Sequence, residues 1–408
     1  MINYIYSKVM ENITFVIPSR NNLEFLKLAY NSIKALGNGH EILVLDDFSS
    51  DGTTEWLKNL NDDSVLIYRN DGPDRIGIVG MFDSGIELAR TEIIMAFHAD
   101  MVAGPKLDEA ILRDLKRGTV VTATRVEPPL HPEGPEKIIE NFGIEAEDFN
   151  YDKWADWCKV PKMSAGTITE GIFAPWCMYK EDFEAIGGHD ELFAPQSRED
   201  SDLFARFYLN GYKFIQTWDG LVYHFTSRGS RFNKHAGGST GVNSQEWINT
   251  NKKNERNFIR KWGNFPGHDQ FMKPVVFPKY DIGLVVTNCK NDQLELLEPW
   301  SSKIYTDAEF MKYITLEQPK TRIKLSDRCF SIQSDVNNGI EVRIDGNTFN
   351  NQDFEYLRNL SQIIQDSGEI GTFELGNLEI SINSLDSFEK SLINNKEKND
   401  VKNQSRRG

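Results

Sequence analysis

The sequence lacks long apolar runs and has few cysteines. None of its apolar stretches approaches the roughly 20 residues that a membrane-spanning helix needs, and its polar start lacks the apolar core of a signal peptide. Its four cysteines show no C-x-x-C or other metal-type spacing, so we expect reduced thiols. These absences predict a cytoplasmic protein that meets a membrane, if at all, only peripherally.

Positive charge is also scarce. The 408 residues include 46 Lys and Arg against 61 Asp and Glu, which gives a formal charge of −15. Nucleic acids and anionic membranes are bound through clustered cations, so this balance argues against both as general partners while allowing a local basic pocket. The length exceeds the roughly 250–300 residues at which single cores stop growing, and it predicts two domains.

Common cofactor signatures are missing as well. No G-x-G-x-x-G follows the first predicted strand, which argues against a dinucleotide-dependent oxidoreductase. The sequence contains neither a P-loop G-x-x-x-x-G-K-[ST] nor the G-x-S-x-G elbow of many hydrolases. The chemistry must therefore be sought in carboxylates and imidazoles.

The first third of the chain alternates strand-like and helix-like segments. Apolar runs are ended by proline or polar residues, and the segments between them repeat apolar residues at helical spacing. This β-α-β-α order predicts an α/β fold with a mostly parallel, Rossmann-like sheet wrapped by helices. The predicted strands of this part are 13–17, 41–45, 65–68, 93–97 and 119–124.

The remainder is less regular. An irregular stretch from about 128 to 160 is typical of a functional loop or lid. The pattern of predicted elements changes again near residues 266–278. We therefore expect a main domain over residues 1–272, a smaller α+β domain over 273–393, and a disordered polar tail over 394–408. The further predicted helices are 199–209, 247–262 and 352–365, and the further strands are 213–215, 221–225, 282–287, 340–344 and 373–382.

Polar side chains follow several of the predicted strands. The carboxyl ends of parallel strands meet at one edge of a sheet, where α/β proteins bind ligands. His98 and Asp100, two residues apart, could hold a divalent cation there, or simply face water. Asp46 and Asp47 could accept hydrogen bonds from a base or ribose, beside residues that cap the next helix.

Three acidic residues, Glu199, Asp200 and Asp202, crowd the first turn of the predicted helix 199–209. The helix dipole favours acids there by roughly 0.3–1 kcal/mol each, but such close like charges should also raise at least one pKa, which suits a general base. His224 ends a predicted strand before a basic loop, 226–231, which could close over a phosphate or remain solvated.

Taken in order, several segments resemble glycosyltransferase family 2, whose members have a GT-A fold. The resemblance covers about residues 13–232, and the order and spacing of its segments are its most specific feature. These segments are VIPSRN (16–21), VLDDFSSDGT (44–53), GIELARTEIIMAFHADM (85–101), GGHDELFAPQSREDSDLFAR (187–206) and Tyr223-His224.

The resemblance implies metal-dependent transfer of a sugar from a nucleotide-diphosphate donor to an acceptor hydroxyl, with inversion. Asp100 and His224 would hold Mn²⁺ or Mg²⁺, and Asp200, paired with Glu199, would be the catalytic base. We also expect Trp176 and Asp202 to contact the acceptor, a glycan, lipid-linked or protein molecule, although an aromatic residue such as Trp176 is more often part of a core. The expected donor-binding residues are Pro18, Ser19, Arg20, Asp46, Asp47, Arg75, His98, Arg228 and Arg231.

Two departures from the family pattern bear on this interpretation. His98 stands where the family usually has the first Asp of its D-x-D element, which keeps a ligand atom but removes a charge. Phe82-Asp83 stands where relatives often have Arg-Asn, so Arg75, Arg228 or Arg231 would replace a phosphate contact.

These departures keep two alternatives open. One is a non-catalytic carbohydrate-binding or scaffold protein of the same fold. The other is a sugar nucleotidyltransferase, against which the first turn counts, because residues 18–22 (Pro-Ser-Arg-Asn-Asn) contain neither the glycines nor the lysine of that class. The C-terminal domain offers no functional residue to sequence reasoning.

Overall fold

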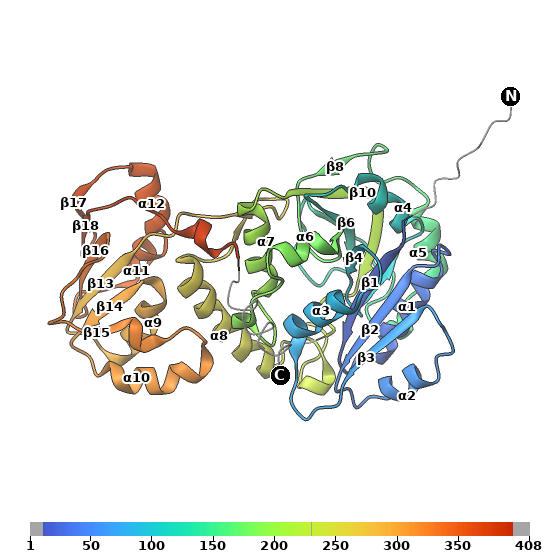
Figure 1. Ribbon diagram of the computed structural model, residues 1–408, viewed down its shortest axis with the longest axis horizontal. Coiled ribbons are helices and arrows are strands. Elements are labelled where there is room, and N and C mark those ends of the chain that lie inside the picture. The colour runs from blue at the N-terminus through green and yellow to red at the C-terminus, as the bar shows by residue number, and fades with distance from the viewer. Residues whose placement is uncertain (1–10, 230, 395–408) are drawn as a thin grey trace, which may run out of the picture. The chain divides into compact units, whose positions relative to one another are not determined.

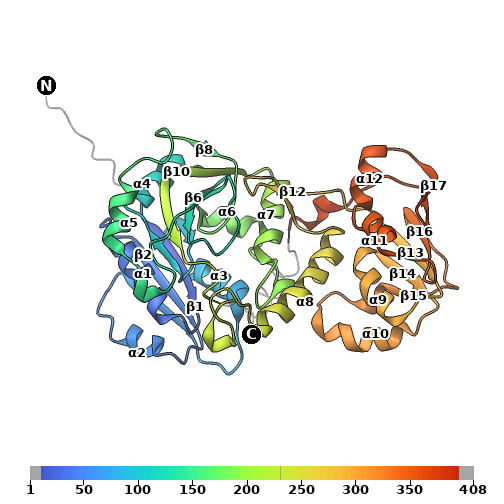
Figure 2. The same cartoon turned by 180° about the vertical axis from the view of Figure 1, so that it is seen from behind.

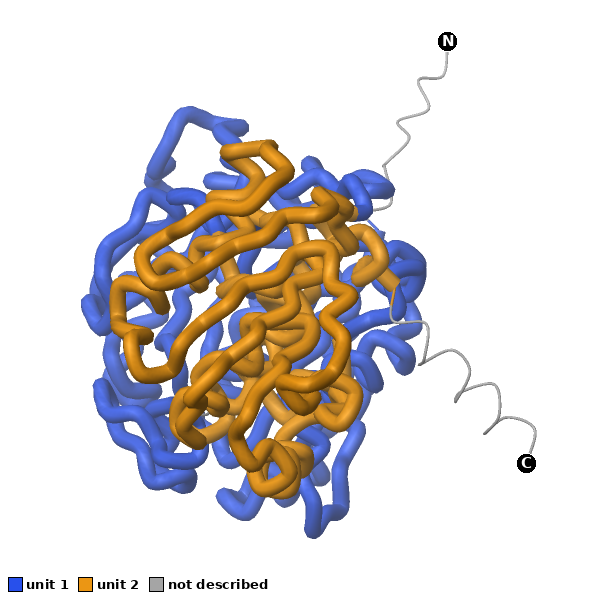
Figure 3. Tube along the Cα trace, turned by 90° about the vertical axis from the view of Figure 1, so that its left-hand side faces the viewer, with its two compact units in different colours: residues 1–189, 210–248, 268–274 blue, residues 190–209, 249–267, 275–408 orange. Residues whose placement is uncertain are grey.

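The computed structural model describes residues 11–229 and 231–394, and its chain forms two compact units (Figure 3). Unit 1 comprises residues 1–189, 210–248 and 268–274, and unit 2 comprises residues 190–209, 249–267 and 275–408. This division differs from the predicted boundary at residue 272, because two helical segments group with the C-terminal sheet. The predicted tail lies, except for Asn394, outside the described residues.

Unit 1 is built on a mixed sheet in which most neighbours run parallel (Figure 1). Antiparallel pairing occurs where β9 lies between β4 and β6, and where β5 and β8 pair with β10. The predicted α/β class is therefore confirmed. The strand order is β3 (Val65–Asn70), β2 (Glu41–Asp47), β1 (Ile13–Ser19), β4 (Ile93–Ala96), β9 (Trp176–Tyr179), β6 (Thr119–Glu127), β10 (Lys213–His224) and β5 (Met101–Ala103), with β7 (Lys137–Ile139) on β6 and β8 (Ile168–Thr169) on β10.

Helices cover both faces of this sheet. Phe15 of β1 belongs to the core cluster that includes Leu26 and Ile111, whereas the neighbouring Val16 faces Gly85 on the opposite side. A Cβ added at Gly85 would lie 2.4 Å from Val16, so glycine permits this close approach. The helices are α1 (Leu23–Lys34), α2 (Thr53–Lys58), α3 (Gly77–Leu88), α4 (Leu107–Asp114), α5 (Tyr151–Cys158), α6 (Lys180–Ala185) and the start of α8 (Gln245–Trp262).

Two predicted features of unit 1 differ in the structure. The segments 213–215 and 221–225, predicted as separate strands, belong to one strand, β10, whose pairing with β6 shifts register between Thr217 and Leu221. The irregular stretch 128–160 contains β7 and α5, and Trp154 of α5 is fully buried against Phe142 and Tyr223.

Unit 2 contains a smaller mixed sheet, seen from behind in Figure 2. Four neighbouring strands are parallel and a C-terminal hairpin is antiparallel. The predicted strand 373–382 is this hairpin, turned at Gly376 with φ +62°, and the predicted helix 352–365 is two helices separated at Asn359. The strand order is β15 (Cys329–Ser331), β14 (Lys303–Thr306), β13 (Ile282–Thr287), β16 (Ile340–Asp345), β18 (Leu378–Ile382) and β17 (Gly371–Leu375).

The helices of unit 2 are α7 (Glu199–Leu209), most of α8, α9 (Asn291–Leu297), α10 (Phe310–Glu317), α11 (Asn351–Arg358) and α12 (Leu360–Ser367). Two short strands, β11 (Gly267–His268) and β12 (Pro274–Val275), pair with each other. Among the described residues, no helix has the length and apolar character required to span a bilayer.

Candidate active site

Three potential metal ligands meet in unit 1. His98 follows β4, Asp100 directly precedes β5, and His224 ends β10, opposite Met101 of β5. One ligand atom from each lies within 4.8 Å of the others. Asp100 and His224, predicted as a pair, are thus neighbours. His98, predicted to contact the donor or to hold a cation beside Asp100, belongs to the same cluster.

Asp100 has one carboxylate oxygen directed at His224. Its Oδ2 accepts a hydrogen bond from the backbone N–H of Arg228 at 2.9 Å, while its Oδ1 lies 3.7 Å from Nε2 of His224. The backbone N–H of Phe225 also donates to the Asp100 carbonyl at 3.0 Å. The backbone of the loop after β10 therefore fixes the position of Asp100 and leaves Oδ1 directed at His224.

His224 is held from its other side by Glu127, which sequence reasoning missed. Nδ1 of His224 lies 3.1 Å from Oε1 of this buried residue, which also pairs with Lys137 at 2.9 Å and Arg125 at 3.5 Å. Burial alone would raise the pKa of Glu127, but the hydrogen bond with His224 and the two cations outweigh burial and hold that pKa well below its usual range. An ionised Glu127 accepts the Nδ1 proton and leaves Nε2 with a lone pair for a metal.

The carboxylates that follow β2 serve the adjacent loops. Both oxygens of Asp46 accept hydrogen bonds, from the backbone of Ser49 and the hydroxyl of Thr54, each at 3.1 Å. Asp47 accepts from the backbone N–H groups of residues 76 and 77, at 3.0 and 2.9 Å, and from Asn70 at 2.8 Å. Both side chains are buried, and these bonds hold the loops that follow β2.

Three residues, two at the end of β1 and one just before α3, carry buried polar atoms without hydrogen-bond partners in the described part of the chain. These atoms are Oγ of Ser19 and Nε of Arg20 and of Arg75. Glu246 of α8 forms a close ion pair with Arg75 and lies 4.0 Å from Arg20. Burial and the nearby charge of Arg75 lower the pKa of Arg20. Pro18, also predicted here, lies within β1 opposite Leu45.

The two arginines of the loop after β10 differ in their surroundings. The guanidinium of Arg228 is buried and donates to Glu145 at 3.1 Å, to Thr240 at 2.6 Å and to the carbonyl of Ile144 at 2.6 Å. These bonds show that Arg228 anchors the loop, while its predicted contact with the donor stays a prediction.

Arg231 is half-buried yet forms no ion pair within residues 11–229 and 231–394. Its Nε donates to Asn243 at 3.0 Å, and its guanidinium lies 4.4 Å from the centre of the Trp247 ring. Burial lowers the pKa of Arg231. His131 stacks on Phe232, the residue that follows Arg231 along the chain, with ring centres 6.1 Å apart.

The predicted acceptor residues are buried. Trp176 is 3% exposed and stacks on Phe183 with ring centres 5.9 Å apart. Asp202 is 0% exposed and bonds to Arg206 at 2.8 Å, Lys261 at 2.6 Å and Trp262 at 2.9 Å. Both predictions are contradicted, since neither side chain offers a surface to an acceptor.

The first turn of α7, in unit 2, presents two acids with different surroundings. Asp200 is exposed, and its Oδ1 accepts from the backbone N–H of Ser201 at 2.6 Å. Glu199 has a buried Oε2 that lacks a hydrogen-bond partner among the described residues. Burial, and then the charge of Asp200, raise the pKa of Glu199 to about 8. The predicted rise in pKa therefore falls on Glu199.

Comparison with solved structures finds low similarity. GalNAc-T7 with UDP, GalNAc and Mn²⁺ is 15% identical, with 54% of this chain and 44% of that chain covered and a TM-score of 0.40. TarS 1–349 from S. aureus is 14% identical, with 52% and 60% covered and a TM-score of 0.38. The mannosyltransferase PcManGT from Pyrobaculum calidifontis, in complex with GDP-Man and Mn²⁺, is 17% identical, with 54% and 58% covered and a TM-score of 0.36. The chain thus spans 44% to 60% of the length of these structures.

Comparison of the sequence with protein families finds a match to part of the chain. No match was found among curated proteins. Residues 14–167 match the family described as Glycosyl transferase family 2, and they include β1 to β4, two of the three clustered ligands and Glu127. Over these residues, which make up less than half of its length, the chain is similar to glycosyl transferase family 2.

Proposed function

We propose that the protein transfers a sugar from a nucleoside-diphosphate donor to an acceptor hydroxyl, with inversion at the anomeric carbon. The observation that carries this proposal is the cluster of His98, Asp100 and His224, whose ligand atoms lie within 4.8 Å of one another in a unit that contains the family 2 region. The acceptor would be a glycan, a lipid-linked molecule or a protein.

The cluster is suited to a divalent metal with an affinity for nitrogen. Two imidazoles and one carboxylate fit Mn²⁺ better than Mg²⁺, which prefers oxygen ligands. His98, Asp100 and His224 would hold the ion, and Glu127 would orient His224. When bound, the metal supplies positive charge that stabilises the departing nucleoside diphosphate.

The donor would be held by cationic and hydroxyl groups of unit 1. Ser19, Arg20 and Arg75 offer buried polar atoms without partners in the described ranges, and a ligand would satisfy them. Arg231, a half-buried cation without a carboxylate partner in the part of the chain described, would bind a phosphate oxygen. Asp46 and Asp47 would shape this site by holding its loops.

Asp200 would be the general base. Its carboxylate would take the proton of the acceptor hydroxyl while that oxygen bonds to the anomeric carbon, and the bond to the nucleoside diphosphate would break with its electron pair on the leaving oxygen. Such assistance contributes ~10²–10⁴-fold in rate. Exposure favours Asp200 over Glu199, because one oxygen of Glu199 is buried.

A panel of nucleotide sugars tests the proposal. With Mn²⁺, the protein should release a free nucleoside diphosphate from one of them, whereas a nucleotidyltransferase would release pyrophosphate. Asp200→Asn should bind that donor normally and transfer almost nothing, while the matched variant Glu199→Gln should retain most of its turnover. Wild-type turnover in Asp200→Asn would disprove the base assignment, and metal-independent or absent nucleotide binding would favour a scaffold.

A further inference from the structure

Within unit 2, α8 contacts both the helix that carries Asp200 and the elements of the C-terminal sheet. Its side chains bond to the lead-in segment 190–198 and to α7 in one direction. In the other direction they bond to η4 (Glu298–Trp300) and to α10. α8 therefore links two parts of unit 2 that are far apart in the sequence.

The lead-in segment is held through backbone carbonyls. Asn254 of α8 is 0% exposed, and its side-chain amide donates to the carbonyls of Phe193 and Gln196, each at 2.7 Å. Lys253 donates to the carbonyl of Ala194, also at 2.7 Å. Bonds to carbonyls fix the path of the chain independently of its side chains.

The last two residues before α7 have a strained backbone. Ser197 and Arg198 have φ angles of +78° and +71°, a left-handed conformation that residues other than glycine rarely adopt. Both are tied to α8: the hydroxyl of Ser197 donates to Asn251 at 2.7 Å, and Arg198 pairs with Glu255 at 3.0 Å. These bonds retain a turn that sets where α7 begins, directly before Glu199 and Asp200.

The first turn of α7 is also bonded to the end of α8. Asp202, two residues after Asp200, accepts from Lys261 at 2.6 Å and from the indole N–H of Trp262 at 2.9 Å. Burial alone would raise the pKa of Asp202, but Lys261 and Arg206 outweigh burial and lower that pKa. An ionised, buried carboxylate fixes α7 against α8.

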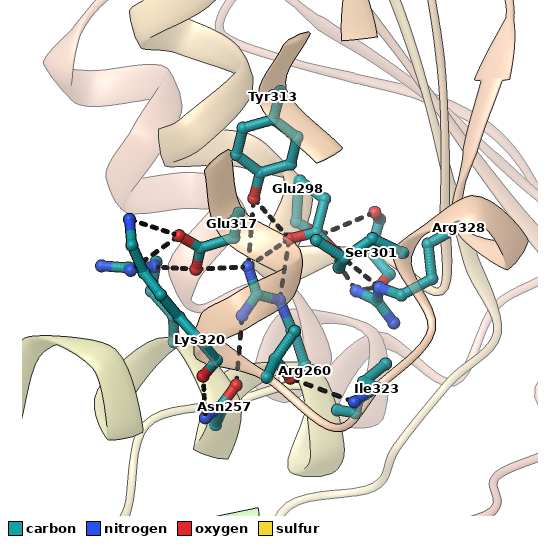
Figure 4. A network of polar contacts seen from close by, with 12 residues as sticks. Asn257, Arg260, Glu298, Ser301, Tyr313, Glu317, Lys320, Ile323 and Arg328 are labelled. Carbon is teal, nitrogen blue, oxygen red and sulfur yellow. Dashed lines mark hydrogen bonds and ion pairs between the residues drawn. The ribbon is translucent and has the colours of Figure 1, made fainter. Parts of the chain in front are cut away.

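On the side toward the C-terminal sheet, α8 takes part in a buried ionic network, which is shown in Figure 4. Arg260 is fully buried and bonds to Glu298 at 2.8 Å, to Glu317 at 3.0 Å and to the hydroxyl of Tyr313 at 3.0 Å. Glu298 is paired in addition with Arg328, which directly precedes β15. Buried charges of this kind are sensitive to loss of any partner, so α8 is tied firmly to the C-terminal sheet.

We infer that the C-terminal part of the chain positions the candidate base, and that Arg260 is the central positioning residue. The inference rests on the proposed function of Asp200. The ionic network around Arg260 holds α8, and α8 in turn holds the segment 190–198 and the start of α7. The C-terminal sheet is thus required for transfer through its effect on the position of Asp200.

The test is Arg260→Met in the full chain, measured against Lys324→Met, which removes an exposed lysine of the same unit. Arg260→Met should lower the turnover of transfer by about 10²-fold, as expected for misplacement of a catalytic group. It should leave the KM for the donor and Mn²⁺-dependent nucleoside-diphosphate binding unchanged. Lys324→Met should change none of these quantities. A folded Arg260→Met with full turnover would overturn the inference.

A double variant separates positioning from general damage. If Arg260 acts through Asp200, adding Arg260→Met to Asp200→Asn should cost no further turnover. An additive loss would overturn the inference. If Arg260→Met does not fold, Asn251→Ala, which removes the acceptor of the Ser197 hydroxyl, should reduce turnover with unchanged donor binding. Full turnover in that variant would equally overturn the inference.

Hydrogen exchange distinguishes failure of this inference from failure of the proposed function. Amides of residues 192–203 should exchange faster in Arg260→Met than in wild type or Lys324→Met, whether or not a donor is found. Unchanged exchange would overturn the positioning role even in an active enzyme. A wild-type protein that transfers no sugar would overturn the proposed function and, with it, the role of Asp200.

Discussion

Nδ1 of His224 lies 3.1 Å from Oε1 of Glu127, a residue of the neighbouring strand that is 97 positions away in the sequence. Because Glu127 is buried and ionised, it holds the proton of His224 on Nδ1 and directs Nε2 toward Asp100. This contact prepares the imidazole as a metal ligand before any metal arrives.

Glu127→Gln should therefore weaken Mn²⁺ binding by about 10- to 100-fold, the usual effect of losing such an outer carboxylate. The side chain keeps its size, so the loss should come from the orientation and basicity of His224 rather than from packing. Calorimetric titration with Mn²⁺ measures it. Glu136→Gln is the matched control, because Glu136 also lies near Arg125 but has no contact with His224 among those described. Equal affinity in both variants would refute the role of Glu127.

The composition of the metal cluster predicts metal preference. With two imidazoles and one carboxylate, turnover with Mn²⁺ should exceed turnover with Mg²⁺. His98→Asp should narrow that difference by about tenfold or more, since it replaces nitrogen by a charged oxygen ligand. Removal of divalent ions with a chelator should abolish transfer, and added Mn²⁺ should restore it. A His98→Asp protein with an unchanged Mn²⁺-to-Mg²⁺ ratio would place His98 outside the coordination shell.

Arg231 and Arg228 should respond differently to the same substitution. Arg231→Gln should weaken nucleoside-diphosphate binding by about 1.5–3 kcal/mol, the strength of a charged hydrogen bond, with little change in thermal stability. Arg228→Gln should instead destabilise unit 1 by about 1–3 kcal/mol, because Glu145 and the Ile144 carbonyl lose a buried donor. Calorimetry and thermal unfolding of both variants separate the two effects. Weaker binding in Arg228→Gln alone would reverse these assignments.

The fold was predictable where local signals were strong. β1 and β2 are short apolar runs ended by polar residues, and their positions agree closely with the prediction. β10 was predicted as two strands because Asp219 and Gly220 interrupt its apolar pattern. In the structure the strand continues through these residues, and its pairing with β6 shifts register there. The hairpin of β17 and β18 was predicted as one strand. The tight turn at Gly376 scarcely interrupts the alternation of apolar and polar residues along the two strands.

The candidate site was predictable only in part. His98 and Asp100 could be placed together because they follow one predicted strand, whereas His224 was paired with Asp100 only through the resemblance to glycosyltransferase family 2. Glu127 could not be found, because its link to His224 depends on the pairing of β6 with β10. The interpretation of Asp202 was wrong because its partners, Lys261 and Trp262, lie on a helix some 60 positions further along the chain.

Glu199 predicts how stability depends on pH. Its pKa is raised in the folded state to about 8, from an ordinary value of 4.5, by burial and by Asp200. Between these two values the unfolded chain has lost the proton that the folded chain keeps, so the folded state binds more protons. The contribution of this group to stability is thus fully present below about pH 4.5 and is lost as the pH rises toward 8.

Replacing this carboxyl by a neutral amide should remove that dependence. We expect the thermal unfolding midpoint of Glu199→Gln to fall less than that of wild type as the pH is raised from 5 to 8. The matched control, Glu369→Gln, removes an exposed carboxylate of the same unit and should leave the wild-type slope unchanged. Parallel slopes in wild type and Glu199→Gln would show that Glu199 ionises in the folded chain as it does in the unfolded one. In that case Glu199 would not be the group whose raised pKa makes stability depend on pH.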